Sequence, residues 1–242
     1  MPPGAGRLAS AFDSPLAKRA YVRRLFSTIA TRYDLITVLL SCGQDRRWKR
    51  QLVSLADPRP GTEALDLACG TGDIALSLAG RGARVVGLDI THRMLQLASD
   101  KQAACSSKAA FVAGDMMALP FPDNRFDVVT TGYGIRNVPD ITTAIAEMRR
   151  VLRPGGQLLS LDFDRPSHLV VRAVYLAYLT VVGSAVGWLL HRDPDTYRYI
   201  PESIRRYPGA ARVSALMREQ GFTSSDHIPV LGGLMAIHRA TK

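Results

Sequence analysis

The sequence predicts an α/β protein: a mostly parallel, seven-stranded sheet with helices on both faces, extra N-terminal helices and a helical insertion after strand five. Three observations predict this fold. Short apolar segments alternate with helical patterns through the middle of the chain. Residues 65–79, LDLACGTGDIALSLA, read as a strand, a glycine turn and the beginning of a helix. The length of 242 residues suits one such domain with a full core.

Five strands are expected before the insertion, at residues 63–68, 83–89, 109–115, 126–132 and 157–163. The helical patterns between them include residues 74–80, 92–104 and 140–152. Because strands and helices alternate, the strands should be parallel and joined by right-handed crossovers. A helix near 210–220 and two strands, near 225–231 and 234–240, are expected to complete the sheet.

Two helical caps are expected within a single domain that spans residues 1–242. Residues 1–56 should form an N-terminal cap of short helices, and residues 168–208 a second helical cap. The core then consists of residues 57–167 and 209–242. Residues 173–190 in the second cap carry no charge, and 18 residues are the lower limit of membrane-spanning length. Two glycines and two tyrosines dilute this segment, which favours a buried or surface-lying helix.

The composition restricts the environment and the partners. A net charge of +10 suits binding to nucleic acid, an anionic membrane surface or simple solubility. The three cysteines lie far apart without a CxxC motif, which favours a reducing cytoplasm. The N-terminus, MPPGAGRLASAF, lacks the apolar core of a signal peptide. The five histidines show no ligand spacing, so we expect no metal.

Acidic residues flank the glycine turn on both sides. Residues 70–75 satisfy the GxGxxA pattern of dinucleotide sites, but a pyrophosphate there would face the like charges of Asp66 and Asp73. S-adenosylmethionine carries no phosphate, and its sulfonium and ammonium groups are cations that carboxylates favour. The turn therefore favours binding of S-adenosylmethionine. The alternative is that the protein is a dehydrogenase that binds a nicotinamide dinucleotide there.

The candidate cofactor residues lie at the ends of successive strands or in the turns after them, which is the edge where open α/β sheets bind ligands. Asp89 is expected to hold the ribose hydroxyls, Asp115 to accept from the adenine amino group, and Met116 to pack on the adenine ring. Gly132 would let the backbone approach the methionine part. For each acid the alternative is a cap on the next helix. The full set is Asp66, Gly70, Thr71, Gly72, Asp89, Asp115, Met116 and Gly132.

The sequence resembles the S-adenosylmethionine-dependent C-methyltransferases of ubiquinone and menaquinone biosynthesis. General methyltransferase features are LDLACGTGD and RVLRPGGQLL. Narrower ones are Tyr33-Asp34 followed by Ser41, Gly43 and Trp48-Lys49, and the segments YGIRNVPD (133–140), YRYIPESIRRYP (197–208) and GGLMAIHRA (232–240). The chain departs from the family pattern at Ile36-Thr37, Gln44-Asp45, Ala68 and LDFDRP (161–166). The resemblance implies a class I, Rossmann-like methyltransferase fold and methyl transfer to a ring carbon of a polyprenylated quinol, demethylmenaquinol or a 2-polyprenyl-benzoquinol.

The quinol chemistry implied by the resemblance needs a cation near a ring oxygen, because the phenolate is the stronger carbon nucleophile. We expect Arg136 to stabilise this oxyanion, with Asn137 as a hydrogen-bonding neighbour, and Asp162 to accept a proton. Tyr33 and Tyr199 would line the ring pocket. The alternatives are structural: Arg136 could cap the following helix or pair with an acid, and Asp162 and the tyrosines could only pack.

Other functions compatible with the sequence are a nucleic-acid or other small-molecule methyltransferase and a non-catalytic S-adenosylmethionine-binding scaffold. No RNA-binding module or aromatic platform accompanies the arginines, so no nucleic-acid partner is expected. The uncharged segment 173–190, together with the basic N-terminal region, predicts a cytoplasmic protein held peripherally at the inner face of the cell membrane.

Overall fold

The computed structural model describes residue 8, residues 10–193 and residues 196–242. The parts of the two predicted caps that fall on residues 1–7, 9, 194 and 195 lie outside the described residues.

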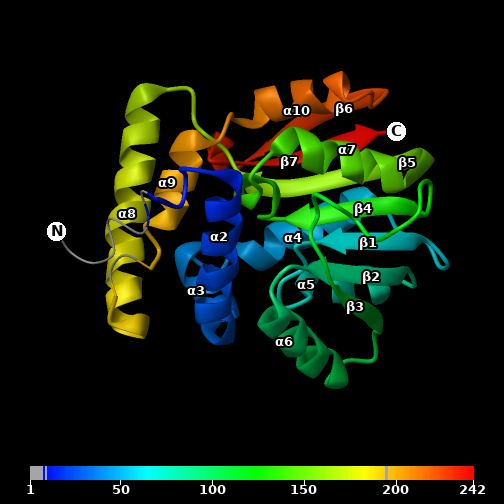
Figure 1. Ribbon diagram of the computed structural model, residues 1–242, viewed down its shortest axis with the longest axis horizontal. Helices are drawn as coiled ribbons and strands as arrows, with labels where there is room; N and C mark the ends of the chain where they lie inside the picture. Colours follow the sequence, from blue (N-terminus) through cyan, green and yellow to red (C-terminus); the bar gives the residue numbers. More distant parts are fainter. Residues whose placement is uncertain (1–7, 9, 194–195) are drawn as a thin grey trace.

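A single seven-stranded sheet forms the centre of the molecule, in the order β3-β2-β1-β4-β5-β7-β6 (Figure 1). All neighbouring strands pair in parallel except β7, which runs antiparallel to both β5 and β6. The prediction of a mostly parallel α/β sheet is therefore confirmed. The strands are β1 (Glu63–Leu67), β2 (Arg84–Asp89), β3 (Ala109–Ala113), β4 (Phe126–Gly132), β5 (Leu152–Phe163), β6 (Ser224–Val230) and β7 (Met235–Thr241).

The helices that follow the strands lie where the sequence pattern predicts them, within a residue or two at most ends. The strand β5 differs, because it begins at Leu152, five residues before the predicted position. Leu152 pairs with Phe126, and the register then shifts so that Gln157 pairs with Val128. The predicted helices are α5 (Asp73–Ala79), α6 (His92–Ala103), α7 (Ile141–Val151) and α10 (Ala210–Glu219). The short helices η2 (Ile135–Asn137) and η3 (Leu231–Gly233) were not predicted.

Alternate residues of the strands build two cores on opposite faces of the sheet. Leu65 and Leu67 pack with buried residues of α7 and α10, whereas Ala64 packs with residues of α4 and α5. This period of two follows from the pleat of a strand that is covered on both faces. Both cores consist mainly of aliphatic side chains with a few aromatic ones, and together they cover the two faces of the sheet.

The two caps lie together beyond the ends of β1 and β4, at one side of the molecule (Figure 1). Buried Ile29 and Ile36 of the first cap pack with Tyr197 of the second. On the other side of the second cap, Tyr175, Leu176 and Leu179 pack with Ile204. The helices of the caps are α2 (Pro15–Ile29), η1 (Ala30–Arg32), α3 (Tyr33–Leu40), α4 (Asp45–Ala56), α8 (Leu169–His191) and α9 (Tyr199–Arg206).

Gly72 allows the first helix of the core to approach the sheet closely. It precedes α5 with a φ of +84°, in the left-handed region that favours glycine. A Cβ on Gly72 would lie 3.0 Å from Cζ of Phe111 and 3.2 Å from Cβ of Ala98. Gly72 therefore serves the packing of α5 against β3 and α6.

We predict that Gly72→Ala lowers the free energy of unfolding by about 2–4 kcal/mol, because it combines left-handed strain with a crowded Cβ. Gly232→Ala is the matched control, since Gly232 also has a positive φ (+64°) but nothing lies within 4 Å of its Cβ position. The control should lose only about 1 kcal/mol, from strain alone. Urea unfolding measures both variants, and equal losses would contradict the packing argument.

Candidate functional site

The first cavity of the site lies at the carboxyl ends of the central strands and has a volume of about 90 Å³. Three residues of α2, Arg19, Val22 and Phe26, line it together with the strand ends. The structure brings seven sequence-predicted site residues together here: Tyr33, Gly70, Asp89, Asp115, Met116, Gly132 and Asn137. We call this the cofactor cavity.

Three other predicted cofactor residues lie outside the cofactor cavity. Asp66 and Thr71 line a smaller adjoining cavity of about 20 Å³. Gly72 lines neither of these cavities and has the packing role described above. Both oxygens of Asp66 accept hydrogen bonds within the core, from the Thr130 hydroxyl at 2.8 Å and the Ala75 backbone N–H at 3.1 Å.

Asp89 holds the glycine turn against the end of β2. One carboxylate oxygen accepts from the backbone N–H of Gly70 at 2.9 Å, and the other from that of Thr91 at 2.7 Å. Burial raises the pKa of Asp89, and these two backbone hydrogen bonds oppose the shift. A carboxylate has about four lone-pair sites, so both oxygens can still accept from a ligand in the cavity.

Asp115 connects the other end of the cofactor cavity to the N-terminal cap. One oxygen accepts from the Met117 backbone N–H at 2.9 Å, and the other lies 2.9 Å from Nε of Arg19. Met116 is buried in the core and lines the cavity. The ion pair with Arg19 places α2 across the cavity beside its adenine-binding candidates.

The residues present fit an adenosyl ligand. Asp89 can accept hydrogen bonds from paired ribose hydroxyls, and Asp115 can accept one from an amino group. An apolar wall for the adenine ring is formed by Leu88, Met94 and Met116. At Gly132 a Cβ would lie 2.7 Å from Cδ1 of Ile74, so the backbone itself borders the cavity.

A second and larger cavity, of about 290 Å³, lies between the two caps. Its lining is overwhelmingly apolar and comes from α2, α3, α8, α9 and the ends of β5 and β7. The predicted site residues Tyr33, Arg136 and Tyr199 line it. The Tyr199 hydroxyl is buried without a hydrogen-bond partner among the described residues. We call this the apolar cavity.

Two tyrosines stand where the cavities meet. Tyr33 and Tyr133 line the cofactor cavity, the small adjoining cavity and the apolar cavity, and Phe26 lines the first and the last. Burial raises the pKa of Tyr33 to about 12, so its hydroxyl stays protonated at neutral pH. Asn137 lies on the cofactor side of this boundary, and its side-chain amide donates to the Tyr133 carbonyl at 2.7 Å.

Arg136 is a buried cation at the wall of the apolar cavity. Its Nε lies 3.2 Å from one oxygen of Asp162, and its backbone N–H donates to the other at 3.0 Å. Nη1 donates to the Ser203 hydroxyl at 2.5 Å, and the guanidinium lies 4.8 Å from the ring centroid of Phe163. These contacts come from two elements, β5 and α9, and together they fix the orientation of the charge.

Asp162 is fully buried and lines none of the three cavities. Besides its two bonds with Arg136 it accepts from the Phe163 backbone N–H at 2.8 Å. The structure therefore places Asp162 behind Arg136, as a positioning residue, rather than beside a substrate from which it could take a proton.

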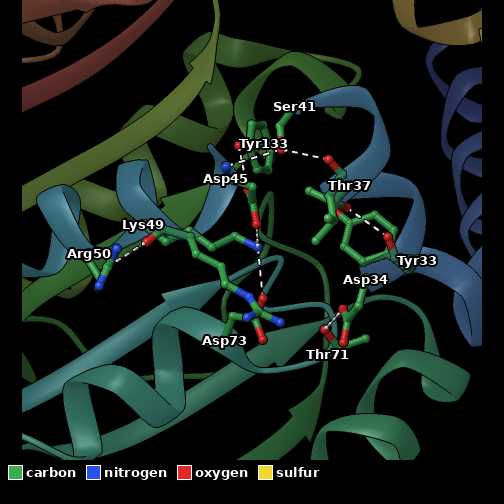
Figure 2. Close-up of polar contacts among 12 residues, drawn as sticks. Tyr33, Asp34, Thr37, Ser41, Asp45, Lys49, Arg50, Thr71, Asp73 and Tyr133 are labelled. Carbon is green, nitrogen blue, oxygen red and sulfur yellow. Dashed lines mark hydrogen bonds and ion pairs between the residues drawn. The ribbon is translucent and has the colours of Figure 1, made fainter. Parts of the chain in front are cut away.

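The structure adds residues that the sequence reasoning did not single out, and Figure 2 shows them. The Tyr133 hydroxyl donates to Asp45 at 2.7 Å, and Lys49 lies 2.7 Å from Asp45 and 2.9 Å from Asp73 (Figure 2). Lys49 was noted only in the family-like pair Trp48-Lys49, without a role in the site. Its spacing of four from Asp45 on one helix was the available signal, because residues at i and i+4 share a face.

Comparisons with known proteins agree with this geometry. The ubiE/COQ5 methyltransferase family profile matches residues 15–242. The ubiquinone/menaquinone biosynthesis C-methyltransferase UbiE of Shewanella oneidensis is 39% identical over 230 residues, which cover 93% of this chain and 92% of the relative. UbiE of Shewanella frigidimarina is 38% identical over the same shares of the two chains.

Solved structures with low sequence identity share the fold. A SAM-dependent methyltransferase from Thermotoga maritima is 19% identical, with a TM-score of 0.66 over 91% of this chain and 99% of that one. Phosphoethanolamine N-methyltransferase 2 of Haemonchus contortus, solved in complex with S-adenosyl-L-methionine, is 15% identical. Its TM-score is 0.60, over 81% of this chain and 52% of that one.

The buried carboxyl group of Asp66 should make the stability of the protein depend on pH. Burial raises its pKa to about 7, so the folded state holds the proton more tightly than the unfolded state. The contribution of Asp66 to stability is therefore greatest below its unfolded pKa of about 4 and is lost as the pH rises to about 7. Asp66→Asn should lack this loss, since its amide can accept from Ala75 and donate to the Thr130 hydroxyl.

We expect the free energy of unfolding of Asp66→Asn, relative to the wild type, to rise by about 2–4 kcal/mol between pH ~4 and pH ~7. Urea unfolding across this range measures the difference. A difference that does not change with pH would show that the pKa of Asp66 is unperturbed.

Proposed function

The chain belongs to the ubiE/COQ5 methyltransferase family, and from this premise we propose that it transfers a methyl group from S-adenosylmethionine to a ring carbon of a polyprenylated quinol, demethylmenaquinol or a 2-polyprenyl-benzoquinol. The observation that carries the proposal is the shared wall between two unlike cavities. A cavity bordered by acidic strand ends meets a larger apolar cavity at Tyr33 and Tyr133. An adenosyl ligand suits the first, and a ring with an apolar tail suits the second.

The cofactor residues follow the strand order along the sheet edge. Asp115 after β3 would hold the adenine amino group, Asp89 at the end of β2 the ribose, and the backbone at Gly70 and Gly132 the methionine part. Bound S-adenosylmethionine supplies a methyl group on a cationic sulfur. The two tyrosines line both cavities together with Phe26, so these side chains would align the reacting groups, a task worth about 7–11 kcal/mol in favourable cases.

Arg136 would make the quinol ring nucleophilic. A phenol titrates near pH ~10 without help, and a fixed cation beside its oxygen favours the phenolate. The guanidinium stays protonated, so Arg136 acts by stabilising the oxyanion rather than as a base. The unpartnered Tyr199 hydroxyl in the same cavity is available to hydrogen-bond to the second ring oxygen.

We also propose that the protein lies peripherally on a membrane through α8. One face of this helix is apolar and exposed: Leu169, Val170, Val171, Val174, Tyr178, Val181, Trp188 and Leu189. Contiguous exposed apolar side chains favour contact with lipid or another apolar surface. The opposite face lines the apolar cavity with Tyr175 and Leu179, so a prenyl tail leaving the bilayer would meet the cavity directly behind the helix.

A peripheral position accounts for α8 better than a span. Within the described residues α8 is the one single helix long and apolar enough to cross a membrane, and 22% of its most apolar window is buried. Tyr175, Leu176 and Leu179 pack against α9, and Tyr175 and Leu179 also line the apolar cavity. A spanning α8 would leave that cavity without its wall. Exposed Arg23 and Arg24 of α2 would add attraction to anionic lipid, about 1 kcal/mol each.

We predict that the purified protein adds one methyl group to a short-tailed demethylquinol in the presence of S-adenosylmethionine, and that Arg136→Gln lowers kcat about 100-fold or more. Glutamine can still donate to Ser203 but carries no charge. Affinity for S-adenosylhomocysteine should stay within about twofold, since Arg136 does not line the cofactor cavity. Mass spectrometry of the quinone and calorimetry measure the two effects. Wild-type protein that binds the cofactor product but never methylates a quinol would reject the enzymatic proposal.

We predict that Val181→Asp together with Leu189→Asp weakens binding to anionic vesicles about 10-fold or more. Both side chains are at least two-thirds exposed, at 68% and 66%, so the fold should tolerate the change. Val112→Asp, on the edge strand β3, is the matched control and should bind vesicles like the wild type. Vesicle flotation measures the partition. Wild-type affinity in the α8 variant would reject membrane contact through this face, and release from membranes only by detergent would favour a span.

A further inference from the structure

We infer that Lys49 is the cation that receives the α-carboxylate of S-adenosylmethionine. The inference rests on the proposed function for the identity of the ligand. It assigns a ligand-binding role to a lysine of the N-terminal cap.

Lys49 lines the small cavity that continues the cofactor cavity. The two cavities share Tyr33, Ala68, Gly70, Gly132 and Tyr133, so a ligand that fills the first extends naturally into the second. Of the described residues that line either cavity, the lysines and arginines are Arg19 and Lys49. These two cations lie at opposite ends of the combined space, because Arg19 pairs with Asp115 and Lys49 with Asp73.

The strand order decides which end receives the amino-acid part of the ligand. Asp115 follows β3 and Asp89 ends β2, whereas Gly70 follows β1 and Gly132 ends β4. When adenine lies at β3 and ribose at β2, the end of the combined space beside β1 and β4 remains for the methionine part. Lys49 lies at that end, and its ammonium lies between Asp45 and Asp73 in Figure 2.

The charges around Lys49 complement the whole ligand. Lys49 and Lys101 form ion pairs with three carboxylates, those of Asp34, Asp45 and Asp73. This cluster carries one excess negative charge, and S-adenosylmethionine carries one excess positive charge. The ligand's carboxylate is nevertheless an anion that needs its own donor. The two ion pairs occupy two of the three N–H groups of Lys49, so the third is available to the small cavity it lines.

Lys49 remains a cation under all physiological conditions. Burial lowers its pKa, but the Asp73 and Asp45 carboxylates raise it more, so the net shift is upward. The alternative role is structural: Lys49 could only tie α4 to α5 through Asp45 and Asp73. A structural lysine would affect every ligand equally, whereas a carboxylate receptor affects only ligands that carry the carboxylate.

The experiment compares two ligands by calorimetry: S-adenosylhomocysteine and its decarboxylated analogue, which lacks only the α-carboxylate. The wild type should bind S-adenosylhomocysteine about 10- to 100-fold more tightly than the analogue, as expected for a charge-assisted hydrogen bond. Lys49→Met should lose about that factor for S-adenosylhomocysteine and no more than about twofold for the analogue. Lys49→Arg should restore much of the preference, since it restores a cation.

Lys101→Met is the matched control. Lys101 pairs with the same Asp73 at 2.6 Å and with Asp34 at 2.7 Å, but it lines neither the cofactor cavity nor the small cavity. This variant disturbs the same cluster and should keep the wild-type preference between the two ligands. Thermal unfolding without ligand shows that each variant is folded before it is titrated.

Equal weakening of both ligands in Lys49→Met would overturn the inference and leave Lys49 a structural role. Equal affinity of the two ligands for the wild type would overturn it without any variant, so the test holds even where Lys49→Met does not fold. A wild type that binds neither ligand would reject the proposed cofactor, and with it the proposed function. A wild type that prefers the carboxylate but methylates no quinol would reject only the proposed reaction.

Discussion

The buried ion pair between Arg136 and Asp162 is the interaction on which the arrangement of the site depends. An arginine at the wall of an apolar cavity is costly unless its charge is matched, and Asp162 at the end of β5 matches it within the fold. The same carboxylate holds the backbone of Arg136, and so it fixes the loop after β4 as well as the side chain. Ser203 extends the arrangement to α9. The cation is thereby set in place before any substrate arrives, which is the condition for electrostatic stabilisation without reorganisation.

The second constraint is that a polar ligand and an apolar one must meet at one point. The sheet edge supplies acids at regular intervals, because parallel strands end on the same side. The caps supply the apolar space, and the N-terminal cap is tied to the core by three ion pairs: Arg19 with Asp115, Lys49 with Asp73, and Asp34 with Lys101. Tyr133 belongs to both systems, since its ring lines the cavities and its hydroxyl donates to Asp45. The boundary between the cavities is therefore built from the same contacts that hold the N-terminal cap in place.

The sequence predicts those parts of the structure that depend on residues close together along the chain. Strand and helix periods locate the sheet, and the acids at strand ends locate the cofactor cavity, as Asp89 and Asp115 show. Contacts between distant segments carry no such signal. The packing role of Gly72 depends on Phe111, 39 positions further along the chain, and the burial of Asp162 depends on Arg136 and on the helices above it. The role of Lys49 was missed for another reason, because in the sequence a lysine among arginines looks like part of a solvated basic segment, whereas its side chain is only 12% exposed.

The helix α8 shows how one segment can meet two demands that composition alone cannot separate. An uncharged helix of this length can be buried in a bilayer, in a protein core, or partly in each. In this fold Gly183 and Gly187 face inward, and the space they leave lets α8 approach the segment that carries Tyr197, where a Cβ on Gly183 would lie 3.3 Å from Cβ of Tyr197. The close approach closes the apolar cavity on one side of the helix and leaves valines exposed on the other. If a long apolar tail enters from a membrane, as we propose, it would need continuous apolar surface as far as the apolar cavity, and a single helix with apolar side chains on both faces would supply that surface.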